Sequence, residues 1–181
     1  MRSLIYDIAV SIDGFIAGPN HDISTFLYEG EHATDYVARL QHYTTVVMGR
    51  STYTSGYAFG LQPGQRAYPH MEHIIFSRSL ELPEERDVQL VREDAVEVVR
   101  TLKEQEGGDI YLCGGGELAG HLHRAGLIDR LILKINPITL GAGRPLFGNH
   151  PTSMRMHLLD QTLHTNGVIV AHYTAHPPAS D

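Results

Sequence analysis

The sequence has a single cysteine, no tryptophan and no long hydrophobic run. Because Cys113 is alone, no disulfide can form within the chain, and a reducing compartment is compatible with it. The apolar run near the N-terminus is short and is interrupted by Asp7, which is unlike a signal peptide or a membrane span. These absences predict a cytoplasmic protein without a membrane partner.

Positive charge is also scarce. Lysine and arginine number 14 against 21 aspartates and glutamates, which gives a formal net charge of −7. A general nucleic-acid-binding protein normally has a basic face, so that class is not expected. The 12 histidines are scattered, and no Cys, Asp or Glu set completes a site near the closest pair, His121 and His123. Metal ligands come in sets of three or four, so we expect no metal site.

Strand and helix patterns alternate along the chain. Apolar, β-branched runs predict strands, and apolar residues at helical spacing predict amphipathic helices. The pair Asn166-Gly167 within residues 154–175 is typical of a hairpin between two final strands. The other expected strands are residues 3–10, 44–48, 72–77, 87–91, 109–113 and 129–138, and the expected helices are residues 31–43, 93–105 and 116–126.

This alternation predicts an α/β fold with a mostly parallel sheet, covered on both faces, and a C-terminal antiparallel hairpin. The 181 residues, 42% of them hydrophobic, fit one domain, which we expect to span residues 1–175 before a short tail at 176–181. In such sheets, ligands bind at the carboxyl ends of the strands. The sequences SIDG, GRST, SRS and GGGE follow predicted strands here, so these loops are the candidate site.

Three consecutive glycines, Gly114 to Gly116, lie between a strand and a helix. Glycine is costly inside regular elements, so the run indicates a backbone constraint. Phosphate binding by N–H groups at the helix start and a tight turn that needs positive φ explain it equally well. The run also matches G-x-G-x-x-A, but a Rossmann fingerprint normally follows the first strand, with an acidic residue at the end of the next strand. Here the run follows the fifth predicted strand and the next strand ends without an acidic residue, so we reject the Rossmann interpretation.

Two arginine-containing loops favour an anionic ligand. Each combines the donor fork of an arginine with neighbouring hydroxyl groups, a chemistry suited to phosphate. Either loop alone fits a surface arginine beside helix caps. Together with the glycine turn, the loops favour a dinucleotide that carries an additional ribose phosphate. The residues concerned are Gly49, Arg50, Ser51 and Thr52 in the first loop and Ser77, Arg78 and Ser79 in the second.

The segments VVMGRSTY, HIIFSRS and IYLCGGGELAGHLHRAGLIDRLIL, in this order, resemble the dihydrofolate reductase superfamily. The match is closer to the branch that includes the reductase domain of riboflavin biosynthesis, which AVSIDGFIAGPN and TLGAGRPLFG also resemble. The resemblance covers roughly residues 3–175. It implies a three-layer, dihydrofolate reductase-like fold with an eight-stranded sheet, and an NADPH-dependent reductase. Relatives often form dimers, which makes a homodimer a further expectation.

The resemblance also implies specific cofactor contacts. Ala9 and Ile16 would contact the nicotinamide, loop 49–52 would hold the pyrophosphate and ribose phosphate side, and loop 77–79 the adenosine 2′-phosphate. The remaining contacts, to the central phosphates and the nicotinamide, would come from Gly114, Gly115, Gly116, Glu117 and Leu118, with a cis peptide bond between the first two.

The substrate side resembles the family less well. Dihydrofolate reductases place a carboxylate on the first helix, and that position falls near Ala33, so folate reduction is disfavoured. Stand-alone relatives usually have a tryptophan after GPxxDI, where this chain offers Phe26. The expected reaction is hydride transfer from NADPH to a C=N or C=O group of a small heterocyclic or carbonyl substrate. Dihydrofolate reductase activity and nucleotide binding without turnover remain alternatives.

Asp7 and Lys134 are out of place in apolar strands. An unpaired buried charge is very costly, and the two strands are adjacent in the superfamily, so we predict that these residues form an ion pair on the pocket floor. Asp7, Ala9 and Ser11 share one strand face, which the resemblance turns toward the cleft. In the functional interpretation, Asp7 orients or protonates the substrate and Lys134 lowers its pKa. A purely structural pair is the alternative. We interpret Asp13 as a turn-forming residue.

Overall fold

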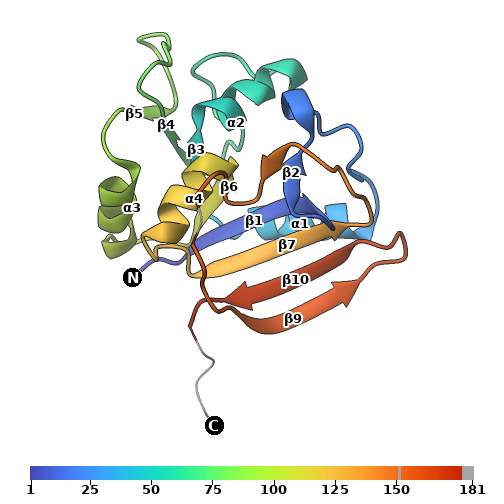
Figure 1. Ribbon diagram of the computed structural model, residues 1–181. Coiled ribbons are helices and arrows are strands. Elements are labelled where there is room, and N and C mark those ends of the chain that lie inside the picture. The colour runs from blue at the N-terminus through green and yellow to red at the C-terminus, as the bar shows by residue number, and fades with distance from the viewer. Residues whose placement is uncertain (151, 177–181) are drawn as a thin grey trace.

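A single eight-stranded sheet organises the computed structural model, which describes residues 1–150 and 152–176 (Figure 1). The strand order is β5-β4-β3-β6-β1-β7-β10-β9. The first six pair in parallel, whereas β10 runs antiparallel to both β7 and β9. The strands are β1 (Leu4–Ser11), β3 (Thr45–Gly49), β4 (Glu72–Phe76), β5 (Gln89–Val91), β6 (Ile110–Gly114), β7 (Arg130–Asn136), β9 (His157–Leu163) and β10 (Ile169–Thr174).

The predicted mostly parallel sheet with a C-terminal hairpin is therefore confirmed. Gly167 has a φ of +85° in the hairpin turn, a conformation that glycine adopts without strain. Of the predicted tail at 176–181, all but residue 176 lies outside the described residues. The division into residues 1–175 and a tail stays a prediction.

Helices cover both faces of the sheet. They are α1 (Glu31–Leu40), α2 (Arg50–Ser55), α3 (Ala95–Glu104) and α4 (Gly116–Arg124), with 3₁₀ turns at η1 (Pro19–His21) and η2 (Gly56–Phe59). The helix predicted over residues 31–43 ends at Leu40 because Tyr43 must turn into the core before β3 begins. A small second sheet pairs β2 (Phe15–Ala17) with β8 (Arg144–Pro145), where the sequence indicated only loops.

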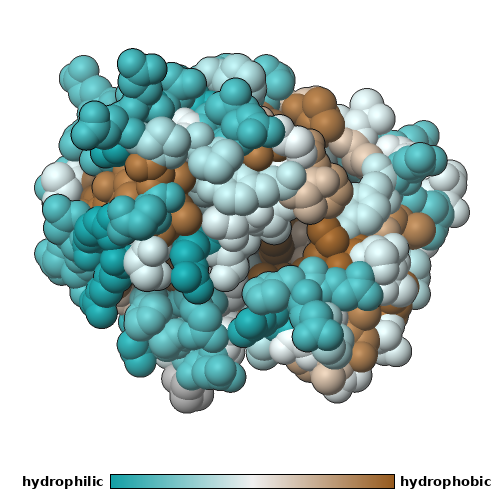
Figure 2. Space-filling view, turned by 90° about the horizontal axis from the view of Figure 1, so that it is seen from above, coloured by the Kyte–Doolittle hydropathy of each residue, from teal (hydrophilic) through white to brown (hydrophobic). Residues whose placement is uncertain are grey.

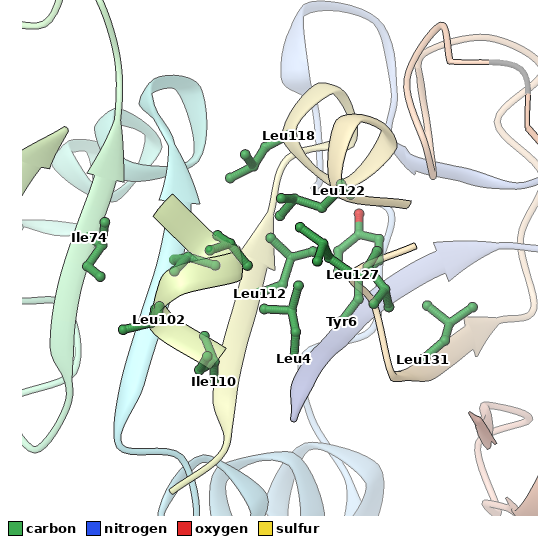
Figure 3. Packing of buried hydrophobic residues seen from close by; sticks show 14 of the residues in the cluster. Leu4, Tyr6, Ile74, Leu102, Ile110, Leu112, Leu118, Leu122, Leu127 and Leu131 are labelled. Carbon is green, nitrogen blue, oxygen red and sulfur yellow. The ribbon is translucent and has the colours of Figure 1, made fainter. Parts of the chain in front are cut away.

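Alternation along β1 separates two packing layers. Leu4 and Tyr6 pack with α3 and α4, as Figure 3 shows, whereas Ile5 packs in the cluster that contains Leu40 of α1. Successive side chains of a strand point to opposite faces, so the same rule sends Asp7 and Ile8 to different layers. This separation decides which strand residues can reach a ligand.

Buried His73 fixes the chain around residue 68. Its Nε2 accepts hydrogen bonds from the backbone N–H groups of Ala67 (3.1 Å) and Tyr68 (3.2 Å). Its Nδ1 must carry the proton, since it lies 3.1 Å from the carbonyl oxygen of Met71, which can only accept. The imidazole therefore has to be neutral, and burial lowers the pKa of His73 from 6.5 to about 4.

We expect the free energy of unfolding to fall as the pH drops from about 6.5 to about 4. The unfolded chain takes up a proton on His73 in this window, whereas the folded protein does not. Melting curves across the window should show a shallower pH dependence for His73→Asn, which cannot be protonated. Identical slopes for the two proteins would contradict this explanation.

Within the described residues, no helix is long and apolar enough to cross a membrane. The same residues contain no group of three or more His, Cys, Asp or Glu side chains that could hold a metal ion.

Candidate functional site

A cleft of about 630 Å³ lies at the carboxyl ends of the parallel strands. That is the size of a typical small-molecule site. Seen from above, the surface is hollowed, with hydrophobic residues in the depth of the hollow and hydrophilic residues along part of its rim (Figure 2). Ala9 and Gly114 are not among the lining residues, and Ser79 lines a smaller hollow that shares Arg50 and Ser51 with the cleft. The predicted residues that line the cleft are Ile16, Gly49, Arg50, Ser51, Thr52, Ser77, Arg78, Gly115, Gly116, Glu117 and Leu118.

Hydrogen bonds from neighbouring residues fix the backbone of the loop after β4, which contains Arg78. The Ser77 hydroxyl accepts hydrogen bonds from the backbone N–H groups of Ser79 (3.3 Å) and Leu80 (2.9 Å), which closes a tight turn. Arg92 donates to the carbonyl oxygens of Arg78 (2.6 Å) and Leu80 (3.0 Å). Arg50 donates to the Ser79 hydroxyl at 3.1 Å. Among the described residues, the exposed Arg78 guanidinium itself has no hydrogen-bond or ion-pair partner.

The three glycines meet different demands. The peptide bond between Gly114 and Gly115 is cis, as expected, and Gly114 has a φ of +118°. Gly115 caps α4 without a side-chain hydrogen bond and lines the cleft. A Cβ on Gly116 would collide with the carbonyl oxygen of Pro145. The turn therefore needs glycine for its backbone at one position and for close packing at another, and it also presents a helix N-terminus to the cleft.

Glu117, predicted to contact the cofactor, also binds a neighbouring loop. Its carboxylate lies 3.0 Å from Nε2 of His150 and accepts the backbone N–H of Asn149 at 3.3 Å.

Asp13 does more than form a turn. Its carboxylate accepts the Ser11 hydroxyl and the backbone N–H groups of Leu140 and Gly141, and these bonds, led by that of Ser11, lower its pKa to about 2.

Sequence reasoning missed several residues of the cleft. Arg92, Glu93 and Asp94 follow β5, so the rule about strand ends would have found them. His21 ends the 3₁₀ turn η1, and Arg144 begins the two-residue strand β8. The Arg144 guanidinium donates to Nε2 of His21 at 3.0 Å, and no periodic pattern signals that approach. Cys113, the last residue before the glycines, also lines the cleft.

The cleft is more positive than the protein around it. The carboxylates of Glu93 and Asp94 accept backbone N–H groups, of Arg92 (3.0 Å) and Val96 (2.8 Å) respectively. Cationic forks beside a helix N-terminus form a suitable surface for phosphate groups. The arginines of the cleft, four against three acidic residues, are Arg50, Arg78, Arg92 and Arg144.

The predicted pairing of Asp7 with Lys134 is confirmed. Lys134 Nζ donates to Asp7 Oδ1 at 2.7 Å, and burial lowers the pKa of Lys134 while the Asp7 carboxylate opposes that change. A third member was not foreseen. Arg39 of α1 donates from Nε to Asp7 Oδ2 at 2.9 Å.

The predicted position of this pair on the pocket floor is wrong. Asp7 is fully buried and lies against α1, and neither Asp7 nor Lys134 lines the cleft. The β1 residue that lines the cleft is Ile8, on the opposite face of the strand. The period of two identified which residues share a face, but not which face meets the cleft. A role for Asp7 and Lys134 in catalysis stays a prediction.

The parallel sheet, the C-terminal hairpin and a cleft at the strand ends define a dihydrofolate reductase-like α/β protein. The family model described as the RibD C-terminal domain matches residues 2–170. The chain therefore belongs to the RibD C-terminal domain family.

Known proteins agree with this placement. YwjB of Bacillus subtilis (strain 168), whose function is uncharacterised, is 31% identical over 160 residues, 87% of this chain and 89% of that protein. A Shewanella sp. PV-4 protein named provisionally for riboflavin biosynthesis has a similar crystal structure, with a TM-score of 0.79, 24% identity and coverage of 96% and 98% of the two chains. The structure of dihydrofolate reductase from Enterococcus faecalis, in a complex with NADP(H), is also similar, with a TM-score of 0.62 and 17% identity. The match covers 94% of this chain and 93% of that chain. The last two support the fold alone.

Proposed function

We propose that this member of a reductase-like family is an NADPH-dependent reductase that transfers hydride to a small heterocyclic or carbonyl substrate. The observation that carries the proposal is Arg78, whose guanidinium has no partner among the described residues although Arg92 and Ser77 fix its backbone. A free donor fork on a fixed loop suits a phosphate dianion. The adenosine 2′-phosphate is the group that distinguishes NADPH from NADH.

The cleft offers a place for each part of this cofactor, which supplies a hydride when bound. Arg78 and Ser79 would hold the 2′-phosphate. Loop 49–52 and the N-terminus of α4, from Gly115 to Leu118, would hold the pyrophosphate. Ile16 would contact the nicotinamide, with Ala9 behind it. These assignments follow the family resemblance and are supported by the lining of the cleft.

The first helix argues against dihydrofolate reductase activity. The side chains of α1 that contact Asp7 and Lys134 are Arg39 and Tyr36, neither of which is a carboxylate. Nucleotide binding without turnover is the second alternative, and only turnover separates it from the main proposal.

The test is a titration of the protein with NADPH and with NADH, followed by NADPH oxidation assays. We expect NADPH to bind at least about ten-fold more tightly than NADH. Dihydrofolate, pyrimidine and quinone substrates then distinguish the alternatives by which of them, if any, is reduced. Equal affinity for the two cofactors would contradict the proposal.

We also propose that the protein is a homodimer in the cytoplasm. Strand β9 forms an edge of the sheet, and its Leu158, Leu159 and Leu163 are exposed. An apolar edge strand is prone to pair with another chain. Sedimentation at micromolar concentration should give the mass of two chains, and a single chain at every concentration would contradict the dimer.

A further inference from the structure

An acidic side chain lies in the part of the cleft where the pyrophosphate of the cofactor is proposed to bind. Glu117 is in the first turn of α4 and lines the cleft. Its carboxylate repels a diphosphate, and a negative side chain in the first turn of a helix is itself attracted to the helix N-terminus. The first N–H groups of a helix have no partner within it, so a ligand phosphate and the Glu117 carboxylate compete for them. Phosphate binding here requires that the carboxylate be held elsewhere.

The loop of residues 145–150 holds that carboxylate. Its Oε1 accepts the backbone N–H of Asn149 at 3.3 Å, and its Oε2 lies 3.0 Å from Nε2 of His150. An ionised carboxylate can only accept hydrogen bonds, so Nε2 of His150 must carry a proton and donate it. Both oxygens of Glu117 therefore have partners on this loop.

Two glycines allow loop 145–150 to lie this close to α4. A Cβ on Gly120 would collide with the carbonyl oxygen of Phe147 and lie 2.6 Å from Cδ2 of His150. Gly148 has a φ of +56°, and a Cβ there would lie 2.6 Å from Oε1 of Glu117. Side chains at these two positions would separate the loop from the helix. The approach of His150 to Glu117 thus depends on the backbone of both elements.

The His150 ring is packed in a defined place. Its centre lies 4.1 Å from that of the His121 ring of α4, and only 13% of the His150 side chain is exposed. His121 also lines the cleft, but burial, followed by the neighbouring charges of His150 and Arg124, lowers its pKa. His121 is therefore neutral at physiological pH and does not offset the charge of Glu117. The direct partner of that carboxylate is His150.

We propose that His150 is a positioning residue, which holds the Glu117 carboxylate on loop 145–150 and so keeps the start of α4 open to the pyrophosphate of the cofactor. This inference rests on the proposed function. It assigns any contact of Glu117 with the cofactor to the backbone N–H, whereas the carboxylate opposes binding. Without His150, the carboxylate would turn to the helix N-terminus and compete with the phosphate groups.

The test measures the binding of ADP by calorimetry, because ADP contains the diphosphate but neither the nicotinamide nor the 2′-phosphate. His150→Phe keeps a ring against His121 and removes the donor. We expect it to weaken ADP binding about five-fold, the size of a charge effect at a helix N-terminus. Glu117→Gln should bind ADP at least as tightly as the wild type. In the double variant, Glu117→Gln should restore the affinity that His150→Phe loses.

Two further variants separate positioning from packing. His150→Gln keeps an N–H donor of similar reach and should retain the wild-type affinity. His42→Phe is the matched control, because His42 is exposed and does not line the cleft, and it should leave ADP binding unchanged. Thermal melting identifies any variant that does not fold. If His150→Phe is such a variant, Glu117→Gln alone still shows whether the carboxylate opposes or assists binding.

Several results would overturn the inference. They are a wild type that does not bind ADP, a folded His150→Phe protein with unchanged affinity, and a Glu117→Gln protein that binds ADP more weakly than the wild type. A double variant as weak as His150→Phe would show that His150 acts through packing of the loop alone, which would equally overturn it.

Titrations of the same proteins with NADPH and NADH keep this inference separate from the proposed function. Both cofactors contain the pyrophosphate, so the ratio of their affinities should keep its wild-type value in every variant. Equal affinities in the wild type would contradict the proposed function. An ADP affinity that does not respond to the His150 and Glu117 variants would overturn only this inference.

Discussion

Arg78→Ala should reduce the preference for NADPH over NADH by ten-fold or more. Hydrogen bonds to a charged group contribute about 1.5–3 kcal/mol, and NADH lacks the phosphate that would receive them. Affinity for NADH should change little, because the Arg78 side chain makes no hydrogen bond or ion pair with any other described residue. Parallel titrations of wild type and variant with both cofactors give the two ratios.

Arg100→Ala is the matched control for this result. Arg100 is an exposed arginine of α3 that pairs only weakly with Glu97, at 3.8 Å, and does not line the cleft. Its replacement should leave both affinities unchanged. If Arg78→Ala keeps the full preference for NADPH, the 2′-phosphate is not bound by the loop after β4. A similar loss for both cofactors would instead indicate that Arg78 contacts a group they share.

The large elements could be predicted because their signals are local. Apolar, β-branched runs marked all eight strands of the main sheet, and Asn166-Gly167 marked the turn of the hairpin. β2 and β8 were missed because each is two or three residues long and exists only through the other. Their pairing joins positions about 130 residues apart, which no local pattern encodes. Contacts of that kind have to come from the folded chain.

The candidate site divides in the same way. The loops after β3, β4 and β6 were found because the topology brings strand ends to one edge, and the loop with Arg92 would have followed from the same rule. Arg39 could not be found so simply. It reaches Asp7 from a helix 32 residues further along the chain, and the sequence does not show which turn of α1 lies over β1. A sequence analysis that does not place Arg39 beside Asp7 cannot detect the excess of positive charge near Tyr36.

Gly116→Ala should destabilise the fold, whereas Gly115→Ala should spare the fold and abolish cofactor binding. A Cβ on Gly116 would overlap the carbonyl oxygen of Pro145 and lie 3.0 Å from the backbone nitrogen of Gly148. Neither group is the flexible end of a side chain, so the backbone has to move. Overpacking of this kind typically costs about 1–3 kcal/mol.

At Gly115, the nearest atom to an added Cβ is the Thr52 hydroxyl oxygen, at 3.3 Å, which needs only a small side-chain adjustment. The new methyl group would lie in the cleft at the start of α4, where the pyrophosphate is proposed to approach the backbone. Thermal melting and NADPH titration of both variants separate the two effects. We expect a lower melting temperature for Gly116→Ala alone and loss of NADPH binding in Gly115→Ala at nearly wild-type stability. A Gly115→Ala protein that melts and binds NADPH like the wild type would mean that the cofactor does not approach this turn.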